Sequence, residues 1–405
     1  MNTQSLSAPS AQQSTSAPPR AARMILSLLE RVQHGALQVT LPDGSSRTLG
    51  SGAHPHQLVL ADWEIFSASL RSGDIGFAES YIGGHWHTDN LPGLIELLVR
   101  NRDEMEALVY GSWWGRLAYR LKHLLNRNTR AGSRKNIHAH YDIGNDFYRL
   151  WLDPSMTYSS AVFRPECGGN LALGQQRKYQ TILAQLATAP GARVLEIGCG
   201  WGGFAEVAAR AGLHVTGLTL SPSQLDYARE RLAAAGLAQS ADLQLCDYRD
   251  SEGQYDAIAS IEMFEAVGQA YWPSFFDTVA RRLKPGGRAC IQTIVIDDAL
   301  FERYAKGSDF IQQYIFPGGM LPSPSEFRRH AKAHGLRVVN ELAFGIDYAD
   351  TLAAWRTSFH ARLDAVRAQG FDQRFIRTWE FYLAYCEAAF RAKNTDVMHF
   401  TLVRD

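Results

Sequence analysis

Closely spaced glycines mark the part of the chain where the residue types most clearly suggest chemistry. In VLEIGCGWGGF, an apolar run that contains Glu196 is followed by Gly198, Gly200 and Gly202. Glycine lets the backbone turn tightly and approach a ligand closely. Such turns serve dinucleotide sites but also simple tight packing, so this loop predicts a cofactor site only together with its surroundings.

Polar residues also follow the next two apolar runs. Thr219 lies near the end of HVTGLTL with Gln224 shortly after it, while Asp247 and Tyr248 follow DLQLC. A carboxylate such as that of Asp247 can accept from an adenine amino group or cap a helix N-terminus, and both interpretations stay open. No Gly-Lys-Ser or Gly-Lys-Thr sequence ends the glycine loop, which argues against a phosphate-binding loop.

A pair of carboxylates and one amide could carry acid–base chemistry. Glu262 and Glu265 lie close together in SIEMFEAVG, and Gln292 interrupts the strand-like run RACIQTIVI. Neighbouring carboxylates are typical of sites at which one group acts as an acid and the other as a base. A buried polar group without a partner costs about 1–3 kcal/mol, so Gln292 either pairs with a neighbouring backbone group or faces a polar site.

These residues need a scaffold that brings them together. After residue 142, helical stretches alternate with strand-like runs, which are RVLEIGC, HVTGLTL, DLQLC, YDAIASI, RACIQTIVI, LRVVNELAF and VMHFTLVR. The alternation predicts an α/β fold with a mostly parallel sheet covered on both faces. Ligands of such sheets bind at the carboxyl ends of the strands, where most of these polar residues stand.

The earlier part of the chain is organised differently. Residues 1–23 are rich in Ser, Ala, Gln and Pro and predict a disordered tail, whereas residues 24–110 predict a small α+β domain. Residues 111–137 form a basic amphipathic linker, with seven Lys or Arg and no acid between residues 113 and 135, ahead of the α/β domain at 138–405. The linker either lies on an anionic membrane, where each basic residue contributes about 1 kcal/mol, or forms a solvated connector helix.

The whole-chain composition narrows the class of protein. A chain of 405 residues that is 46% hydrophobic predicts two globular domains, and 41 basic against 41 acidic residues give no general attraction to nucleic acid. Five widely spaced cysteines predict reduced thiols in the cytoplasm. No run approaches the roughly 18 apolar residues of a membrane-spanning helix, and the start lacks the apolar core of a signal peptide. His138 and His140 have no further ligands at suitable spacing, so no metal site is expected.

Several separated motifs resemble one enzyme family. The motifs are HYDIGNDFYRLWLDPSMTYSSAVF, LTLSPSQ, SIEMFEAVG, YIFPGGMLPS and DYADTLAAW, and from about residue 140 to the C-terminus the chain closely resembles the cyclopropane-fatty-acid synthase family. The resemblance implies the fold of class I S-adenosylmethionine (SAM) methyltransferases, a Rossmann-like seven-stranded sheet with a helical acyl-binding cap. It also implies that a methylene group from SAM is added across a cis double bond of an acyl chain, usually in a membrane phospholipid. The domain at 24–110 resembles the accessory domain of the longer members.

The resemblance also implies which residues meet SAM and the acyl chain. Tyr158 and Ser159 would hold the methionine end of SAM, and Tyr141 would face the acyl pocket. Glu262 is expected to help on the SAM side or to face solvent. The remaining cofactor residues come from the glycine loop and the strand ends, and they are Glu196, Gly198, Gly200, Gly202, Thr219, Gln224, Asp247, Tyr248 and Ile261.

The base in the resembled family is a bound bicarbonate, held by a Cys, a Glu, a His, an Ile backbone group and a Tyr. The motifs match the Glu, the Ile and the Tyr to Glu265, Ile294 and Tyr348, but they place Ser160 where the family has Cys and Gln292 where it has His. Glutamine cannot carry a proton or a positive charge as histidine can. The sequence therefore predicts a cyclopropane-forming enzyme and leaves two alternatives open: an enzyme that makes a methyl- or methylene-branched chain, and a catalytically weakened lipid-binding homologue.

The expected partners follow from this chemistry. They are unsaturated phospholipid acyl chains and an anionic membrane surface, with no nucleic acid, and a homodimer is left open. The expected location is the cytoplasmic side of the inner membrane, with the enzyme bound peripherally.

Overall fold

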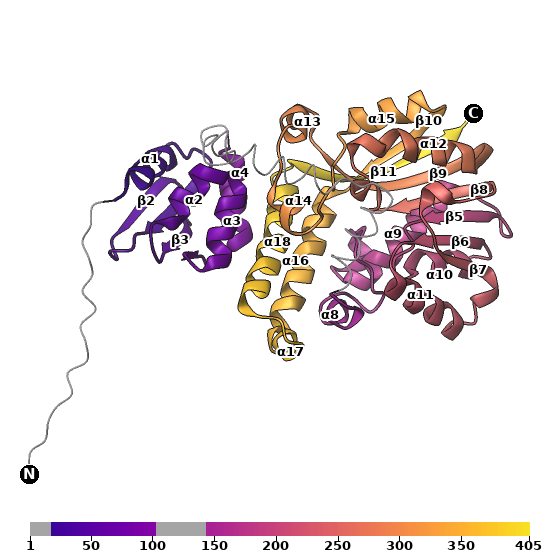
Figure 1. Cartoon of the computed structure of the whole chain (residues 1–405), viewed down its shortest axis with the longest axis horizontal. Coiled ribbons are helices and arrows are strands. Elements are labelled where there is room, and N and C mark those ends of the chain that lie inside the picture. The colour runs from indigo at the N-terminus through magenta and orange to yellow at the C-terminus, as the bar shows by residue number, and fades with distance from the viewer. Residues whose placement is uncertain (1–17, 103–142) are drawn as a thin grey trace, which may run out of the picture. The chain divides into compact units, whose positions relative to one another are not determined.

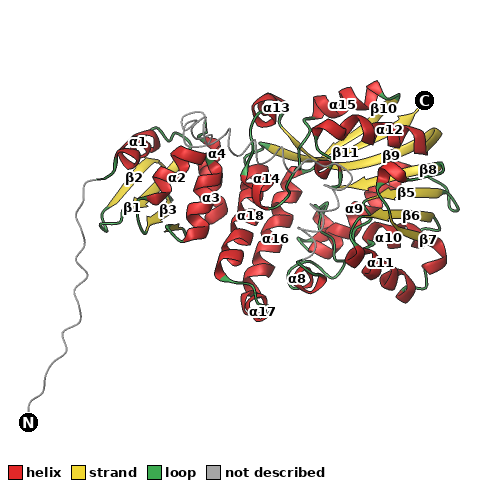
Figure 2. Cartoon of the chain, viewed as in Figure 1, coloured by secondary structure: helices red, strands yellow, loops and turns green. Residues whose placement is uncertain are grey.

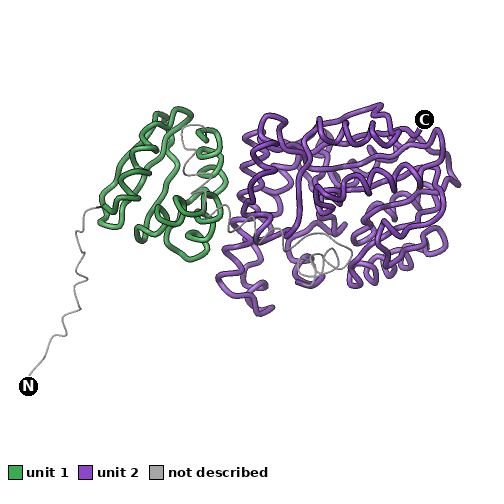
Figure 3. Tube along the Cα trace, turned by 45° about the horizontal axis from the view of Figure 1, so that its top comes forward, with its two compact units in different colours: residues 1–112 green, residues 113–405 purple. Residues whose placement is uncertain are grey.

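The computed structural model of the protein describes residues 18–102 and 143–405. The chain divides into two compact units, residues 1–112 and 113–405, which Figure 3 colours separately. The basic linker at 111–137 and Tyr141 lie outside the described residues, as does most of the expected tail, so the expectations for them stay predictions.

The first unit is an α+β domain around a four-stranded sheet (Figure 2). Its elements are α1 (Arg20–Leu29), β1 (Gly35–Thr40), β2 (Ser46–Ser51), β3 (His56–Leu60), α2 (Glu64–Ser72), α3 (Asp74–Gly83), β4 (Trp86–His87) and α4 (Leu91–Arg100). The strand order is β2-β1-β3-β4, with β1 parallel to β3 and antiparallel to β2. Helix α1 begins within the expected tail of residues 1–23, because Ala22 is fully buried and Pro19 is tolerated just before a first helical turn.

The second unit contains a seven-stranded sheet whose strands are those expected from the sequence (Figure 1). They are β5 (Arg193–Ile197), β6 (His214–Thr219), β7 (Ala241–Leu245), β8 (Tyr255–Ile261), β9 (Leu283–Ile296), β10 (Leu336–Ala343) and β11 (Thr395–Arg404). The strand order is β10-β11-β9-β8-β5-β6-β7. Strand β11 runs in the opposite direction to the other six. The predicted α/β fold is therefore confirmed.

Helices cover both faces of this sheet, as the apolar strands require. One face packs against α9 (Leu171–Leu186), α10 (Gly203–Arg210) and α11 (Pro222–Ala234), which contribute Ile182, Phe204 and Leu225 to one core. The other face packs against α12 (Trp272–Arg282) and α15 (Pro324–Ala333), with Phe276 and Phe327 in a second core. Each fully buried phenylalanine contributes about 1.5–3 kcal/mol. The two cores hold the carboxyl ends of β5 to β9 in fixed positions.

A helical layer completes the second unit (Figure 1). It comprises α8 (Asn145–Arg149), α13 (Asp298–Ala305), α14 (Phe310–Tyr314), α16 (Gly345–Ala361), α17 (Leu363–Ala368) and α18 (Gln373–Arg391). Helices α16 and α18 pack against each other, and the Trp355 and Trp379 rings lie 5.7 and 5.9 Å from that of Trp151. Short 3-10 helices occur at Pro165–Cys167, Ala238–Ser240, Tyr248–Asp250, Phe264–Ala266 and Gln269–Tyr271. Within residues 18–102 and 143–405, no helix has the length and apolar character needed to cross a bilayer.

Candidate active site

The glycine loop joins β5 to α10 through backbone conformations that favour glycine. Gly198, Gly200 and Gly202 have φ of +88°, +49° and +80°. A Cβ added to Gly198 would lie 2.9 Å from the Met263 side chain, whereas a Cβ added to Gly200 would meet nothing within 4 Å among the described residues. The backbone at Gly200 therefore borders open space, where a ligand can approach it closely.

Glu196 supplies a buried polar group just before this loop. Its side chain is 2% exposed, and its Oε2 has no hydrogen-bond partner among the described residues. Burial raises the pKa of Glu196 to about 8, although the positive charges of Lys178 and Arg231 act to lower it. A buried acceptor without a partner, next to a glycine that borders open space, fits a ligand that carries its own donor groups, as the amino-acid end of SAM does.

Lys178 on α9 is a fully buried lysine that sequence reasoning did not single out. Its Nζ donates to Ser159 Oγ over 2.6 Å. Burial lowers the pKa of Lys178 to about 7, whereas the negative charges of Glu262, Asp153 and Glu196 raise it. The expected cofactor residue Ser159 is thus bound to an amino group whose charge also acts on Glu196 and Glu262.

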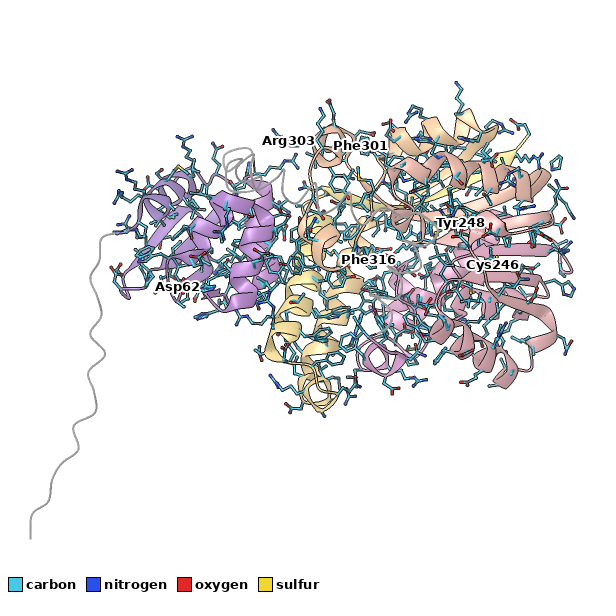
Figure 4. The ribbon with its side chains drawn as sticks, in the orientation of Figure 1. Asp62, Cys246, Tyr248, Phe301, Arg303 and Phe316 are labelled. Carbon is cyan, nitrogen blue, oxygen red and sulfur yellow. The ribbon has the colours of Figure 1, made fainter. Side chains whose placement is uncertain are left out.

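The ends of β6 and β7 carry the other expected cofactor residues. Thr219 Oγ1 donates to Gln224 Oε1 over 3.1 Å, which places the two side chains together after β6. After β7, Asp247 accepts from the Arg249 backbone N–H and from its guanidinium, so the helix-cap interpretation is confirmed. Contact of Asp247 with adenine stays a prediction. Tyr248, labelled with Cys246 in Figure 4, packs against Phe275, and burial raises its pKa to about 12.

Two further expected cofactor residues are Tyr158, which contacts the helical layer, and Ile261, which belongs to the sheet. The Tyr158 hydroxyl lies 2.6 Å from the Tyr382 hydroxyl, and its ring is 5.3 Å from that of Trp355. Ile261 ends β8 and pairs with Gln292 across the sheet. The cofactor candidates therefore come from the carboxyl ends of β5 to β8 and from the segment before α9, as ligand sites of such sheets do.

Glu262, directly after β8, lies at the centre of a cluster that the sequence did not predict. Its Oε1 accepts from the Ser160 backbone N–H at 2.8 Å and from Gln292 Nε2 at 2.7 Å, while its Oε2 accepts from the Tyr348 hydroxyl at 2.6 Å. Glu262 therefore faces a group of donors rather than solvent, and its expected role on the SAM side stays a prediction. Three groups expected to bind an external anion donate to this carboxylate instead.

Gln292 owes its orientation to a residue on the neighbouring strand. His399 on β11 pairs directly with Gln292 on β9, and the His399 Nε2 lies 2.9 Å from the Gln292 Oε1. Since the amide oxygen can only accept, His399 is the donor, and the Gln292 NH₂ is directed at Glu262. Sequence reasoning missed His399, although a lone histidine within the apolar run VMHFTLVR is a signal of the same kind as Gln292.

Ser160 faces the cluster through its backbone. Its N–H donates to Glu262, but its Oγ donates to the Ala161 carbonyl oxygen over 2.9 Å. The Ser160 hydroxyl thus does not donate to the cluster, and its expected role at an anion stays a prediction. The fully buried hydroxyl meets its hydrogen-bonding requirement within its own turn.

Glu265 forms a second, separate group. Its Oε1 accepts from the Ile294 backbone N–H and from Thr293 Oγ1, and its Oε2 is buried without a partner among the described residues. Burial and the negative charge of Glu262 raise the pKa of Glu265 to about 8. Three of the expected anion ligands thus donate to Glu262 and one donates to Glu265, which is itself the fifth, and a shared anion site stays a prediction.

The two carboxylates have different electrostatic surroundings. Burial raises the pKa of Glu262, but Tyr348, Lys178, the Ser160 N–H and the Gln292 amide all act to lower it. Glu265 has fewer donors and a like charge beside it. We therefore assign the proton of the pair at neutral pH to Glu265 and the negative charge to Glu262. Within residues 18–102 and 143–405, no group of three His, Cys, Asp or Glu could hold a metal ion, and His138 and His140 lie outside those residues.

Comparisons with known proteins show which family the chain resembles. A family model described as mycolic acid cyclopropane synthetase matches residues 128–400. The tuberculostearic acid methyltransferase UfaA1 of Mycobacterium tuberculosis is 36% identical over 379 residues, which cover 92% of this chain and 88% of that protein. The cyclopropane-fatty-acyl-phospholipid synthase of Escherichia coli is 34% identical over 360 residues, which cover 87% of this chain and 89% of that protein.

A solved structure supports the same assignment. The mycolic acid cyclopropane synthase CmaA1, complexed with SAH and CTAB, has a TM-score of 0.62 and 31% identity, and the match covers 67% of this chain and 98% of that one. The family match spans well over half of this chain, and both curated relatives are matched over most of their length. The chain therefore belongs to the mycolic acid cyclopropane synthetase family of SAM-dependent methyltransferases.

Proposed function

We propose that the protein transfers a one-carbon unit from SAM to the cis double bond of an unsaturated acyl chain in a membrane phospholipid. One observation carries the proposal: an acid–base cluster around Glu262 and Glu265 stands at the carboxyl end of β8, beside the glycine loop of β5. The names of the two curated relatives support a fatty acyl substrate.

The reaction places clear demands on the residues around the double bond. SAM supplies an electrophilic methyl group, and the alkene that attacks it becomes a carbocation. The site must then exclude water, which would trap the cation, and must offer a base for one proton. The aromatic side chains between α8, α16 and α18 supply apolar surroundings, and Glu262 and Glu265 supply groups that can accept or hold a proton.

The identity of the base is part of this proposal. A bound bicarbonate, the base implied by the family resemblance, would compete with Glu262 for the Ser160 N–H, the Gln292 amide and the Tyr348 hydroxyl. It would also compete with Glu265 for the Ile294 N–H. A chain carboxylate already accepts from each of these donors.

The primary product is a cyclopropane ring, formed when the base removes a proton from the transferred methyl group. A second candidate is a branched acyl chain, which forms when a hydride shift precedes proton loss. It is favoured by the match to the tuberculostearic acid methyltransferase, which covers 92% of this chain, and by the amide at Gln292 in place of an imidazole. A lipid-binding homologue without activity is disfavoured, because both carboxylates and the open glycine loop are present.

The proposal is tested with the purified full chain, SAM and phospholipid vesicles. Vesicles with palmitoyl-oleoyl chains should yield a lipid heavier by one CH₂ unit, whereas fully saturated vesicles should not react. NMR of the product then distinguishes ring protons from an exocyclic methylene or a methyl branch. Methylation of the head group, or no reaction with any unsaturated phospholipid, would contradict the proposal.

A further inference from the structure

We propose that the Glu262 carboxylate is itself the base of the reaction, so that the enzyme needs no external anion. The inference rests on the proposed function, because it names the group that takes the proton lost from the acyl chain. It follows from the position of this carboxylate, which accepts hydrogen bonds from donors that a bound anion would otherwise use.

The geometry leaves Glu262 able to accept a proton. A carboxylate offers about four acceptor positions. The described contacts fill two on Oε1, from the Ser160 N–H and Gln292 Nε2, and one on Oε2, from the Tyr348 hydroxyl. One position on Oε2 is therefore left for the proton, while the other contacts hold the carboxylate in place.

Gln292 holds Glu262 by two separate contacts. The Glu262 backbone N–H donates to the Gln292 backbone carbonyl oxygen over 2.9 Å, and the Gln292 side-chain amide donates to Glu262 Oε1 over 2.7 Å. His399 in turn fixes the orientation of that amide. Glutamine at residue 292, where the resembled family has histidine, therefore suits a carboxylate at residue 262. Its amide supplies two N–H donors and one acceptor without adding charge.

The backbone of Glu262 is also in an uncommon conformation. Its φ is +51°, in the left-handed region that side-chain-bearing residues seldom adopt. Such conformations cluster at functional sites, where surrounding contacts maintain them. Here the conformation turns the carboxylate toward Ser160 and Tyr348, which lie far from it along the chain.

The titratable groups around Glu262 suit a base that works at neutral pH. Tyr348 donates to it, buried Lys178 adds a positive charge, and Glu265 holds the proton of the carboxylate pair. His399 stays neutral because burial lowers its pKa to about 3, so it does not compete for the proton. The donors around Glu262 thus favour its ionised form more than those around Glu265 do.

The proposed step balances in atoms and electrons. The alkene electron pair forms a bond to the methyl carbon as the S–CH₃ bond of SAM breaks. A C–H bond of the resulting cation then breaks, and its electrons close the cyclopropane ring or form a new double bond. The proton passes to Glu262 Oε2, and it returns to solvent before the next turnover.

The test compares Glu262→Gln and Glu262→Ala with Glu341→Gln, a control on β10 that removes a carboxylate bound to Arg328. Turnover of Glu262→Gln should fall on the order of 10²-fold or more, the usual scale for loss of a general base, while SAM affinity by calorimetry stays unchanged. Formate or bicarbonate should restore part of the turnover of Glu262→Ala, which leaves space for an anion, but not of Glu262→Gln, in which an amide fills that space.

Wild-type turnover should be unaffected by removal of dissolved carbon dioxide and bicarbonate. Near-normal turnover of Glu262→Gln, or a wild-type requirement for bicarbonate, would overturn the proposal. NMR with ¹³C-bicarbonate decides the question without turnover: binding only by Glu262→Ala supports the proposal, and saturable binding by the wild type refutes it. If the wild type modifies no unsaturated phospholipid, the proposed function fails, and this binding experiment still decides whether residue 262 takes the place of the anion.

Discussion

His399 and Gln292 face each other across β11 and β9, and a 2.9 Å hydrogen bond joins the imidazole Nε2 to the amide oxygen. Both side chains are fully buried. Through this bond a residue on the last strand determines which end of the amide reaches Glu262. His399 is therefore a positioning residue, and it acts on the carboxylate only through Gln292.

Removal of the His399 donor should loosen the site without affecting the cofactor. In His399→Phe the buried Gln292 oxygen loses its partner, so the free energy of unfolding should fall by about 1–3 kcal/mol. We expect kcat to fall roughly 10-fold at unchanged KM for vesicles, with partial recovery in His399→Gln, whose amide can still donate. Thr401→Val, which removes a hydroxyl from the same strand, is the control and should retain kcat. Equal kcat values for His399→Phe and the wild type would show that Gln292 needs no support.

His399 also predicts how stability depends on pH. Burial lowers its pKa from 6.5 to about 3, so the unfolded chain binds a proton that the folded chain does not bind between these values. The stabilisation from this residue is complete above pH 6.5 and is lost as the pH falls toward 3. Urea unfolding at several pH values should show this slope in the wild type and a smaller one in His399→Phe. An identical slope in both proteins would contradict the assignment.

The pKa of Glu265 predicts the opposite dependence of stability on pH. Its pKa is raised from 4.5 to about 8, so the folded chain holds a proton that the unfolded chain has released. The stabilisation from this group is complete below pH 4.5 and is lost as the pH rises through 8. Glu265→Gln keeps an acceptor for the Ile294 N–H. In this variant the unfolding free energy should change less with pH between 4.5 and about 8 than in the wild type.

The same residue separates two roles in catalysis. Glu265→Gln, which mimics the neutral acid, should keep most of the turnover, whereas Glu265→Ala should lose on the order of 10²-fold because the Ile294 N–H is left without a partner. SAM affinity should be unchanged in both variants. If Glu265→Gln were as inactive as Glu265→Ala, Glu265 would act as an ionised base and the assignment of the two carboxylates would be reversed.

The glycine loop offers a test with a matched control. Gly200 and Gly191 both have positive φ, at +49° and +84°, and a Cβ added at either position meets no atom of residues 18–102 or 143–405 within 4 Å. Gly200→Val and Gly191→Val should therefore cost similar backbone strain, about 1–3 kcal/mol in unfolding free energy. Only Gly200→Val should abolish SAM binding in calorimetry. Undiminished affinity in a folded Gly200→Val protein would remove the cofactor assignment.

The basic linker predicts salt-dependent membrane binding, although it lies outside the described residues. Sedimentation with anionic vesicles should weaken as rising salt shortens the Debye length below about 8 Å. Low-salt binding should weaken similarly when four linker residues become Gln: Arg116, Arg120, Lys122 and Arg127. The control changes four exposed cations of the second unit to Gln: Arg281, Lys306, Arg329 and Arg367. Equal sedimentation of the linker variant and the control variant would favour the connector interpretation.

The sequence by itself determined the scaffold and the position of the site. Alternating apolar runs predicted the strands, because burial on both faces requires continuous apolar residues, and the polar residues at the strand ends marked the ligand-binding edge. Gln292 was conspicuous because an amide in a buried strand needs partners, but only the family resemblance placed it at the site. Local patterns were sufficient for the strands and the ligand-binding edge.

Only the tertiary structure decided which groups meet. Glu262 accepts from Ser160 and Tyr348, which are 102 and 86 residues away along the chain, and Gln292 takes its orientation from His399, 107 residues away. The family resemblance therefore favoured Glu265 as the centre of the site and left Glu262 aside. Which carboxylate keeps its charge depends on donors that come from separate strands and helices. These donors meet only when the chain has folded.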